Sequence, residues 1–286
     1  LPAATRALAR TRFAPLSAAP LLMVGTSPHP TAHFAALFVK KLCRLGRRSP
    51  KHVAVVGELS RLVDQHKMMD VSQLEQELAC QDDHGAQFKA LQEMLGNRNL
   101  ATVDALRLVM LYTLHYETKS GNHVDALKQM LRDRNCDQVG LLDTLLKYAG
   151  AGKRGGDLYG NKSFMAQLGK GLAGLKGVEN VYTQHVPYFS EVIEQAAKGR
   201  LKDGSYPVVS GAGGGQKGAK HVVVFVLGGI TYEEAAAVAR MNQAAGANGC
   251  KIVLGGTFIH NSKSFLTELN RLKEIYQGYG GGGFGR

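Results

Sequence analysis

Apolar residues recur with helical spacing from Val53 onward. The first stripe follows the spacing i, i+1, i+4, i+7 and i+8, and is formed by Val55, Val56, Leu59, Leu62 and Val63. Pro50 suits the entrance of a helix, because its missing amide hydrogen has no helical partner there anyway. The pattern predicts a helix whose apolar stripe faces the core. Its polar residues Glu58, Arg61 and Gln65 then face outward.

Three further helices are predicted before residue 150. The segment from about Thr102 to Tyr116 is apolar on several sides, so we expect it to be well buried. The next helix begins at Asn122, a favourable N-cap residue. The last of the three carries Leu141, Leu142, Leu145 and Leu146. Residues 51–149 are therefore expected to form an all-helical unit with short connections.

Two glycine-rich stretches follow, Gly150–Gly160 and Gly211–Gly218, and their low side-chain content is typical of loops. A short helix is predicted between them, over about Pro187–Lys198. Gly199 stands directly after it and is the residue type that most readily ends a helix.

The pattern changes to strands in the last third of the chain. His221–Leu227 is rich in β-branched and apolar residues without alternation, which predicts a strand buried on both faces. Gly228-Gly229 forms a tight turn, and Thr231 with Glu234 matches a capping box that opens a helix. Lys251–Leu254 predicts a second short strand.

A strand, a helix and a second strand in this order predict a βαβ unit of a parallel sheet. We expect a further helix, about Ser262–Ile275, to cover this unit. Two strands alone are too few for a stable parallel sheet, so the remaining strands are expected from polypeptide outside these 286 residues. The predicted fold class is mixed α and α/β, with a helical domain followed by a βαβ portion of an incomplete parallel sheet.

The formal net charge of +12 first suggests nucleic-acid binding. Residues 1–50, however, hold eight Lys and Arg and no Asp or Glu, which leaves only +4 for the rest of the chain. A nucleic-acid interface needs a basic stripe on a folded surface, and this segment shows little sign of folding. We therefore expect no nucleic-acid partner and a disordered segment 1–50. Its composition also matches an organellar transit peptide, so its origin, transit-like or mistranslated, stays open.

Motifs for catalysis and cofactor binding are weak. Gly155–Ser163 resembles a phosphate-binding loop, but Asn161 interrupts the required Gly-Lys-Ser order and the segment follows a predicted helix. Asp82-Asp83-His84 is expected to be a solvated turn rather than a metal site. The cysteines Cys43, Cys80, Cys136 and Cys250 are too far apart for zinc-finger spacing. We predict no catalytic residue, no metal and no cofactor.

The longest apolar run is Val222–Leu227, whereas a membrane-spanning helix needs roughly 20 residues. The sequence therefore predicts no membrane span. From the residues alone, the chain is a helical plus α/β protein whose most natural role is that of an interaction module.

Three stretches resemble the SM family, the Sec-one/Munc-eighteen-like regulators of SNARE assembly. Lys51–Val63 is similar to the helix that enters the family's central helical domain. Gly177–His185 and Val223–Ala235, the latter continuing through Val238–Asn242, are similar to the family's endosomal and trans-Golgi branch. Three matches in the family's order are far more specific than one, and together they span about residues 50–275.

The resemblance implies a domain division. Residues 51–207 would be part of the helical third domain, residues 208–275 the end of the α/β second domain, and residues 276–286 a glycine-rich tail. The family's first domain, and the first strands of its second, have no counterpart in this sequence.

The resemblance also implies a function. The family has no catalytic residues and no required cofactor; its members bind syntaxin-type SNAREs and SNARE complexes and promote vesicle docking and fusion. A cytoplasmic protein, peripheral to Golgi and endosomal membranes through its partners, is therefore expected. The helix from Lys51 would carry part of the SNARE-contact surface, with Glu58, Arg61 and Gln65 as candidate contacts.

Two alternatives stay open. One is a nucleotide-binding α/β enzyme fragment that uses the Gly228-Gly229 turn at a helix N-terminus, although Glu233 and Glu234 would repel a phosphate. The other is a non-functional truncated gene product. Thermal stabilisation by ATP or NAD would favour the first alternative.

Overall fold

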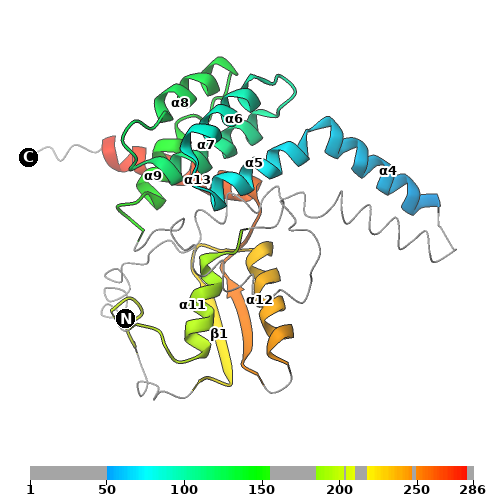
Figure 1. Ribbon diagram of the computed structural model, residues 1–286. Coiled ribbons are helices and arrows are strands. Elements are labelled where there is room, and N and C mark those ends of the chain that lie inside the picture. Colours follow the sequence, from blue (N-terminus) through cyan, green and yellow to red (C-terminus); the bar gives the residue numbers. More distant parts are fainter. Residues whose placement is uncertain (1–49, 155–184, 203, 210–217, 247–248, 282–286) are drawn as a thin grey trace, which may run out of the picture.

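The computed structural model describes residues 50–154, 185–202, 204–209, 218–246 and 249–281. The chain forms a helical lobe and a smaller α/β lobe (Figure 1). The helical lobe contains α4 (Pro50–Gln65), α5 (Met68–Cys80), α6 (His84–Gly96), α7 (Thr102–Tyr116), α8 (Val124–Asp133), α9 (Leu141–Ala149) and α13 (Ser262–Gly281). The α/β lobe contains α11 (Tyr188–Ala197), β1 (His221–Val226), β2 (Ile230–Thr231), α12 (Tyr232–Ala245), β3 (Lys251–Gly256) and β4 (Ile259–His260). The predicted mixed class is confirmed.

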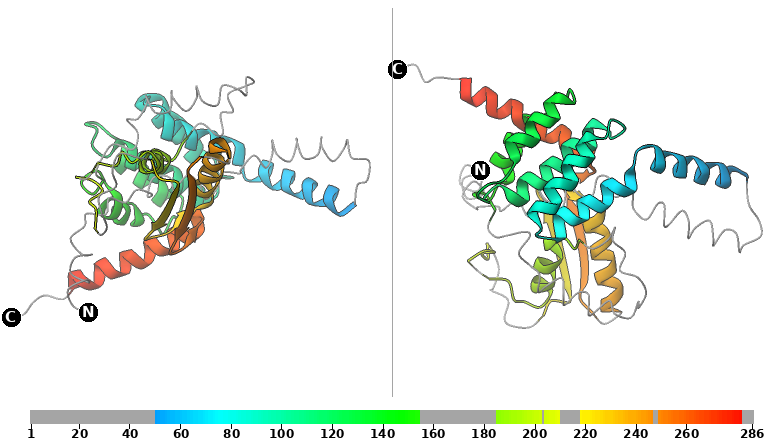
Figure 2. Two further views of the ribbon diagram at one scale, coloured as in Figure 1. Left: turned by 90° about the horizontal axis from the view of Figure 1, so that it is seen from below. Right: turned by 45° about the horizontal axis from the view of Figure 1, so that its top comes forward.

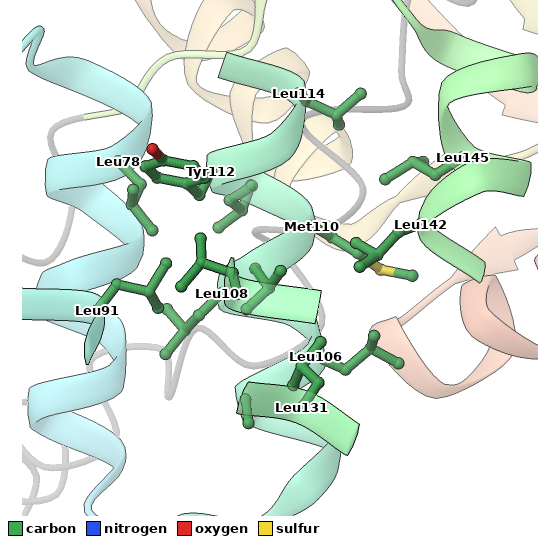
Figure 3. Close-up of a cluster of buried hydrophobic side chains, with 14 of the residues drawn as sticks. Leu78, Leu91, Leu106, Leu108, Met110, Tyr112, Leu114, Leu131, Leu142 and Leu145 are labelled. Atoms are coloured by element: carbon green, nitrogen blue, oxygen red, sulfur yellow. The ribbon is translucent and has the colours of Figure 1, made fainter. Parts of the chain in front are cut away.

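Helix α7 is the centre of the helical lobe. Its residues are apolar on nearly every side, and those from Ala105 to Leu114 are all buried. It packs against α5 and α6 on one side and against α8 and α9 on the other. Figure 3 shows Leu78 beside Tyr112 of α7 and Leu91 beside Leu108, while Leu142 lies near Met110. The sequence-based expectation of a well-buried helix is confirmed.

Helices α5 and α6 were not among the predicted elements, although they lie within the segment expected to be helical. Helix α5 buries Val71, Leu74 and Leu78 at helical spacing. The Asp83 carboxylate accepts a hydrogen bond from the Ala86 amide at 3.1 Å and so caps α6. Part of the acidic cluster that the sequence places in a turn therefore has a structural role.

The other predicted helices agree closely with the structure. Helix α8 begins at Val124 rather than at Asn122, whose side chain instead accepts a hydrogen bond from the Val124 amide at 3.2 Å. Helix α11 ends next to Gly199, which has a φ of 66° in the left-handed region, as the predicted C-terminal glycine requires.

The predicted βαβ unit is present. Strands β1 and β3 pair in parallel, with Val222 opposite Ile252 and Val224 opposite Leu254, and α12 connects them. Thr231 and Glu234 form the expected capping box at the start of α12. Short strands β2 and β4 also pair in parallel. Helices α11 and α12 cover one face of the β1–β3 sheet and enclose a small core with it.

The expectation that β1 is buried on both faces is wrong for the described residues. Its side chains alternate between exposed and half-buried. Val223 and Phe225 are 76% and 62% exposed, and Val253 of β3 is exposed beside them. The covering helices α11 and α12 lie on the opposite face. An apolar run shows that both faces can be buried, but it does not show that both have a covering element.

Helix α13 was predicted to cover the βαβ unit, but this prediction is wrong. The helix crosses to the helical lobe and packs against α9, where Phe265, Leu266 and Leu269 join the lobe's core (Figure 2). The helix continues to Gly281, well into the segment expected to be a glycine-rich tail.

Some expectations fall outside the described residues. These are the predicted disorder of residues 1–49, the loop Gly155–Ser163 and most of the loop Gly211–Gly218. Within the described ranges, no helix combines the length and the apolar character that crossing a membrane requires.

Candidate functional site

Helix α4 carries the three candidate contact residues and projects from the edge of the helical lobe (Figure 1). Among the described elements it packs on α5, the helix that follows it. Only the last part of α4 reaches the core, where Val63 is buried and Leu62 is half-buried.

The predicted orientation of the α4 apolar stripe is therefore partly wrong. Val63 faces the core as expected, but Val55 and Leu59 are 58% and 40% exposed among the described residues. The reason is that the helix extends beyond the described elements of the lobe, so their side chains cannot reach the start of the stripe. Apolar spacing predicted the helix but not how far along it the covering core extends.

The polar residues of α4 face outward, as the stripe predicts, and form one hydrogen-bonded group. Arg61 donates from Nε and Nη2 to both carboxylate oxygens of Glu58, at 2.8 and 2.6 Å. Its Nη1 donates to Gln65 Oε1 at 2.6 Å. The hydrogen bond from Arg61 is the main reason that the pKa of Glu58 is lowered, and the same bond raises the pKa of Arg61.

These five residues, Val55, Glu58, Leu59, Arg61 and Gln65, are called the α4 surface below. Two exposed apolar side chains lie beside three polar ones along one projecting helix. Such a surface is suited to docking another helix, because apolar anchors supply affinity while flanking charges set orientation and partner choice. The surface offers no proton-transfer pair and no nucleophile.

The sequence-based reasoning identified Glu58, Arg61 and Gln65 but assigned Val55 and Leu59 to the core. In the structure these two are the apolar part of the surface. Their residue types are the same in a buried and in an exposed stripe, so the sequence held no signal that separates the two cases.

The Gly228-Gly229 turn was the alternative candidate site. Two amides in and directly after the turn are already hydrogen-bonded: Gly228 donates to Thr257 Oγ1 at 3.0 Å and Ile230 to the Phe258 carbonyl at 2.9 Å. The Thr231 amide donates to the Glu234 carboxylate at 2.8 Å. A phosphate at a helix N-terminus needs free amides, so this turn is a poor anion site.

The other polar candidates have structural partners. His84 lies with Nε2 at 2.7 Å from the Tyr112 hydroxyl, beside the cap formed by Asp83. Across the described residues, no group of three or more His, Cys, Asp or Glu side chains is arranged to hold a metal ion. Cys80, Cys136 and Cys250 are free thiols, and burial raises the pKa of Cys80 to about 12.

Comparison with known proteins gives a consistent result. The model of the Sec1 family matches residues 38–268. Vacuolar protein sorting-associated protein 45 of Homo sapiens is 45% identical over 221 residues, which cover 77% of this chain and 38% of that protein. The homolog of that protein in Arabidopsis thaliana is 44% identical over 226 residues, covering 79% of this chain and 39% of its own length.

Solved structures show the same likeness. The structure described as the SM protein Vps45 in complex with the Qa SNARE Tlg2 matches with a TM-score of 0.66 and 35% identity. The match covers 85% of this chain and 41% of that one. This chain thus spans about two fifths of the length of the proteins that it resembles.

Proposed function

This chain belongs to the Sec1 family, and from that premise we propose that it regulates SNARE assembly in vesicle docking and fusion on an endosomal, trans-Golgi or vacuolar route. It acts by binding a syntaxin-type SNARE or an assembled SNARE complex. It is an interaction protein rather than an enzyme, cytoplasmic and held at Golgi or endosomal membranes through its partners.

The observation that carries this proposal is the α4 surface. A solved relative is bound to a Qa SNARE, and an amphipathic helix of a partner docks by laying its apolar face against exposed apolar side chains. The projecting α4 offers such a helix two apolar anchors, Val55 and Leu59, that no described element covers. The neighbouring Glu58–Arg61 ion pair is exposed and can select between partners by charge.

The test is direct binding of the full 286-residue chain to the immobilised cytosolic region of a syntaxin-type SNARE. Replacing Val55 and Leu59 together with serine removes both apolar anchors. We expect the affinity to fall by about tenfold to a hundredfold, the range expected for losing two modest hot-spot side chains. The matched control is Val103→Ser, because Val103 is also an exposed helical valine, 44% exposed, at the start of α7. This control should leave the affinity unchanged.

The charged pair requires its own control. The double reversal Glu58→Lys with Arg61→Glu should change the association rate and its dependence on salt more than the melting temperature. Glu268 and Arg271 on α13 form an exposed pair with the same spacing, with Arg271 Nη1 at 2.6 Å from Glu268 Oε1. Their double reversal should leave binding unchanged. If the serine variant and the α4 reversal both bind as tightly as the unaltered chain, the SNARE contact lies elsewhere. If the unaltered chain binds no SNARE, the proposed function of this chain is wrong.

A further inference from the structure

The junction between α4 and α5 is a sharp bend in an otherwise helical segment (Figure 2). Only His66 and Lys67 separate the two helices. Lys67 has φ 52° and ψ 35°, a left-handed conformation that is unusual for a residue other than glycine. In a residue other than glycine, the population of this conformation is about five- to thirtyfold lower than that of the right-handed helical one.

The local sequence does not call for a bend. Residues 65–69 read Gln-His-Lys-Met-Met, with no glycine and no proline, and Gln, Lys and Met are favourable helix formers. Local preference therefore favours one continuous helix over residues 50–80. The observed bend conflicts with that preference, so it must be held by contacts elsewhere in the fold.

The α-helical hydrogen-bond pattern is interrupted at the bend: among the described residues, the amides of Met68, Met69 and Asp70 donate to no backbone carbonyl of residues 64–66. The His66 amide donates to the Leu62 carbonyl at 3.0 Å, and the Val71 amide to the Lys67 carbonyl at 3.1 Å, both in the α-helical pattern. The Lys67 amide donates to Asp64 at 3.3 Å. Lys67 is the residue of this junction with positive φ, so continuing α4 into α5 requires its backbone to move into the right-handed region.

Contacts with the helical lobe hold the bent form. Val63 is buried just before the bend, while α5 is fixed in the core after it. His66 lies near Asp104 at the start of α7; burial raises the pKa of that carboxyl, and the nearby imidazole opposes the rise. Straightening the segment would remove the Val63 contact and move His66 away from Asp104, in exchange for relaxing Lys67.

We propose that residues His66 and Lys67 are a two-state hinge. In the bent state, seen here, Lys67 is left-handed and α4 projects from the lobe. In the straight state, α4 and α5 form one helix, and the α4 surface points in a different direction. The hinge thereby sets where α4 presents its exposed side chains. The inference does not depend on the proposed function, because the two states are defined without any partner.

The test is a distance measurement by pulsed electron spin resonance on the full chain. Spin labels are placed at Ser60 on α4 and Gln129 on α8, two exposed positions, through a non-natural amino acid that leaves the native cysteines in place. We expect two distance populations in the unaltered chain. Lys67→Gly should raise the ratio of the bent to the straight population at least about fivefold, because glycine adopts the left-handed conformation without the penalty that lysine carries.

Lys67→Ile should move the ratio the other way, because a β-branched residue is a strong outlier in the left-handed region. Its helix content by circular dichroism should hold or rise. Asn135→Gly is the matched control: Asn135 is a second non-glycine residue with positive φ, 56°, after α8, and changing it should leave the distances unchanged. One identical distance population in all variants would overturn the hinge. Loss of helix content with a broad distribution in Lys67→Ile would also overturn it, since it would show that no straight helix exists.

Discussion

Replacing Arg107 tests how the helical lobe holds α5 against α7. The Arg107 side chain is fully buried on α7 and contacts Glu75 of α5, which is buried as well. A second carboxylate, Asp104, lies with Oδ1 at 2.5 Å from Arg107 Nη1 and is 13% exposed. One buried cation therefore faces two acidic groups at the contact between the helices.

The variant Arg107→Met keeps much of the side-chain volume and removes the charge. Glu75 would then be left as a buried carboxylate without its cation, and breaking a buried pair in this way costs about 3–5 kcal/mol. The double variant Arg107→Met with Glu75→Leu removes the cation and the buried Glu75 carboxylate, while the carboxylate of Asp104, which is 13% exposed, stays in place. Replacing a buried pair by apolar residues is often neutral or stabilising, so this variant should recover to within about 1 kcal/mol of the unaltered chain.

The measurement is urea unfolding followed by the loss of helical circular dichroism. With a slope of about 2–3 kcal/mol per molar urea, the single variant should lower the midpoint by about 1–2.5 M at an unchanged slope. The reasoning would be refuted if the double variant were as unstable as the single one, because the loss would then come from packing and not from an unpaired charge. A single variant within about 1 kcal/mol of the unaltered chain would refute it equally.

Two more predictions concern backbone geometry and pH. Gly229→Ala should destabilise the α/β lobe by at least about 2 kcal/mol, because φ is 103° and an added Cβ would lie 2.4 Å from the His260 ring. Gly246→Ala, with φ of 65° and open space around it, should cost only about 1 kcal/mol in the same melting assay. Burial, followed by nearby positive charge, holds the pKa of His84 below 6.5. The unfolded chain then binds more protons, so stability should fall as the pH drops below about 6.5, and His84→Phe should weaken that dependence in unfolding measured at pH 5.5 and 7.5.

The sequence was sufficient where one local pattern determines one structure. Thr231 and Glu234 predicted the capping box of α12, and the β-branched run from His221 predicted β1. The signals for α5 and α6 were also present, since Val71, Leu74 and Leu78 have helical spacing and Asp83 precedes α6 as a cap. The sequence therefore contained enough information to predict both helices, although neither was predicted.

What each element packs against could not be predicted from its own residues. The exposed Val55 of α4 and the buried Val63 belong to one stripe of the same spacing. Among the described elements none covers Phe225 of β1, because α11 and α12 lie on the other face of the sheet. The direction in which a neighbouring element lies is tertiary information that a single stretch of sequence does not contain. The sequence therefore predicted the polar residues of the candidate site but not its two apolar residues.

The path of α13 has a consequence for synthesis on the ribosome. Phe265, Leu266 and Leu269 complete the core of a lobe whose other helices are made much earlier in the chain. Until these residues emerge, the face of α9 that they cover remains open to solvent or to a chaperone. The helices α4 to α9 precede the α/β lobe in this sequence, yet their lobe is completed only after that lobe has been made. A frameshift within the codons for α13 would therefore damage the core of the helical lobe as well as α13 itself.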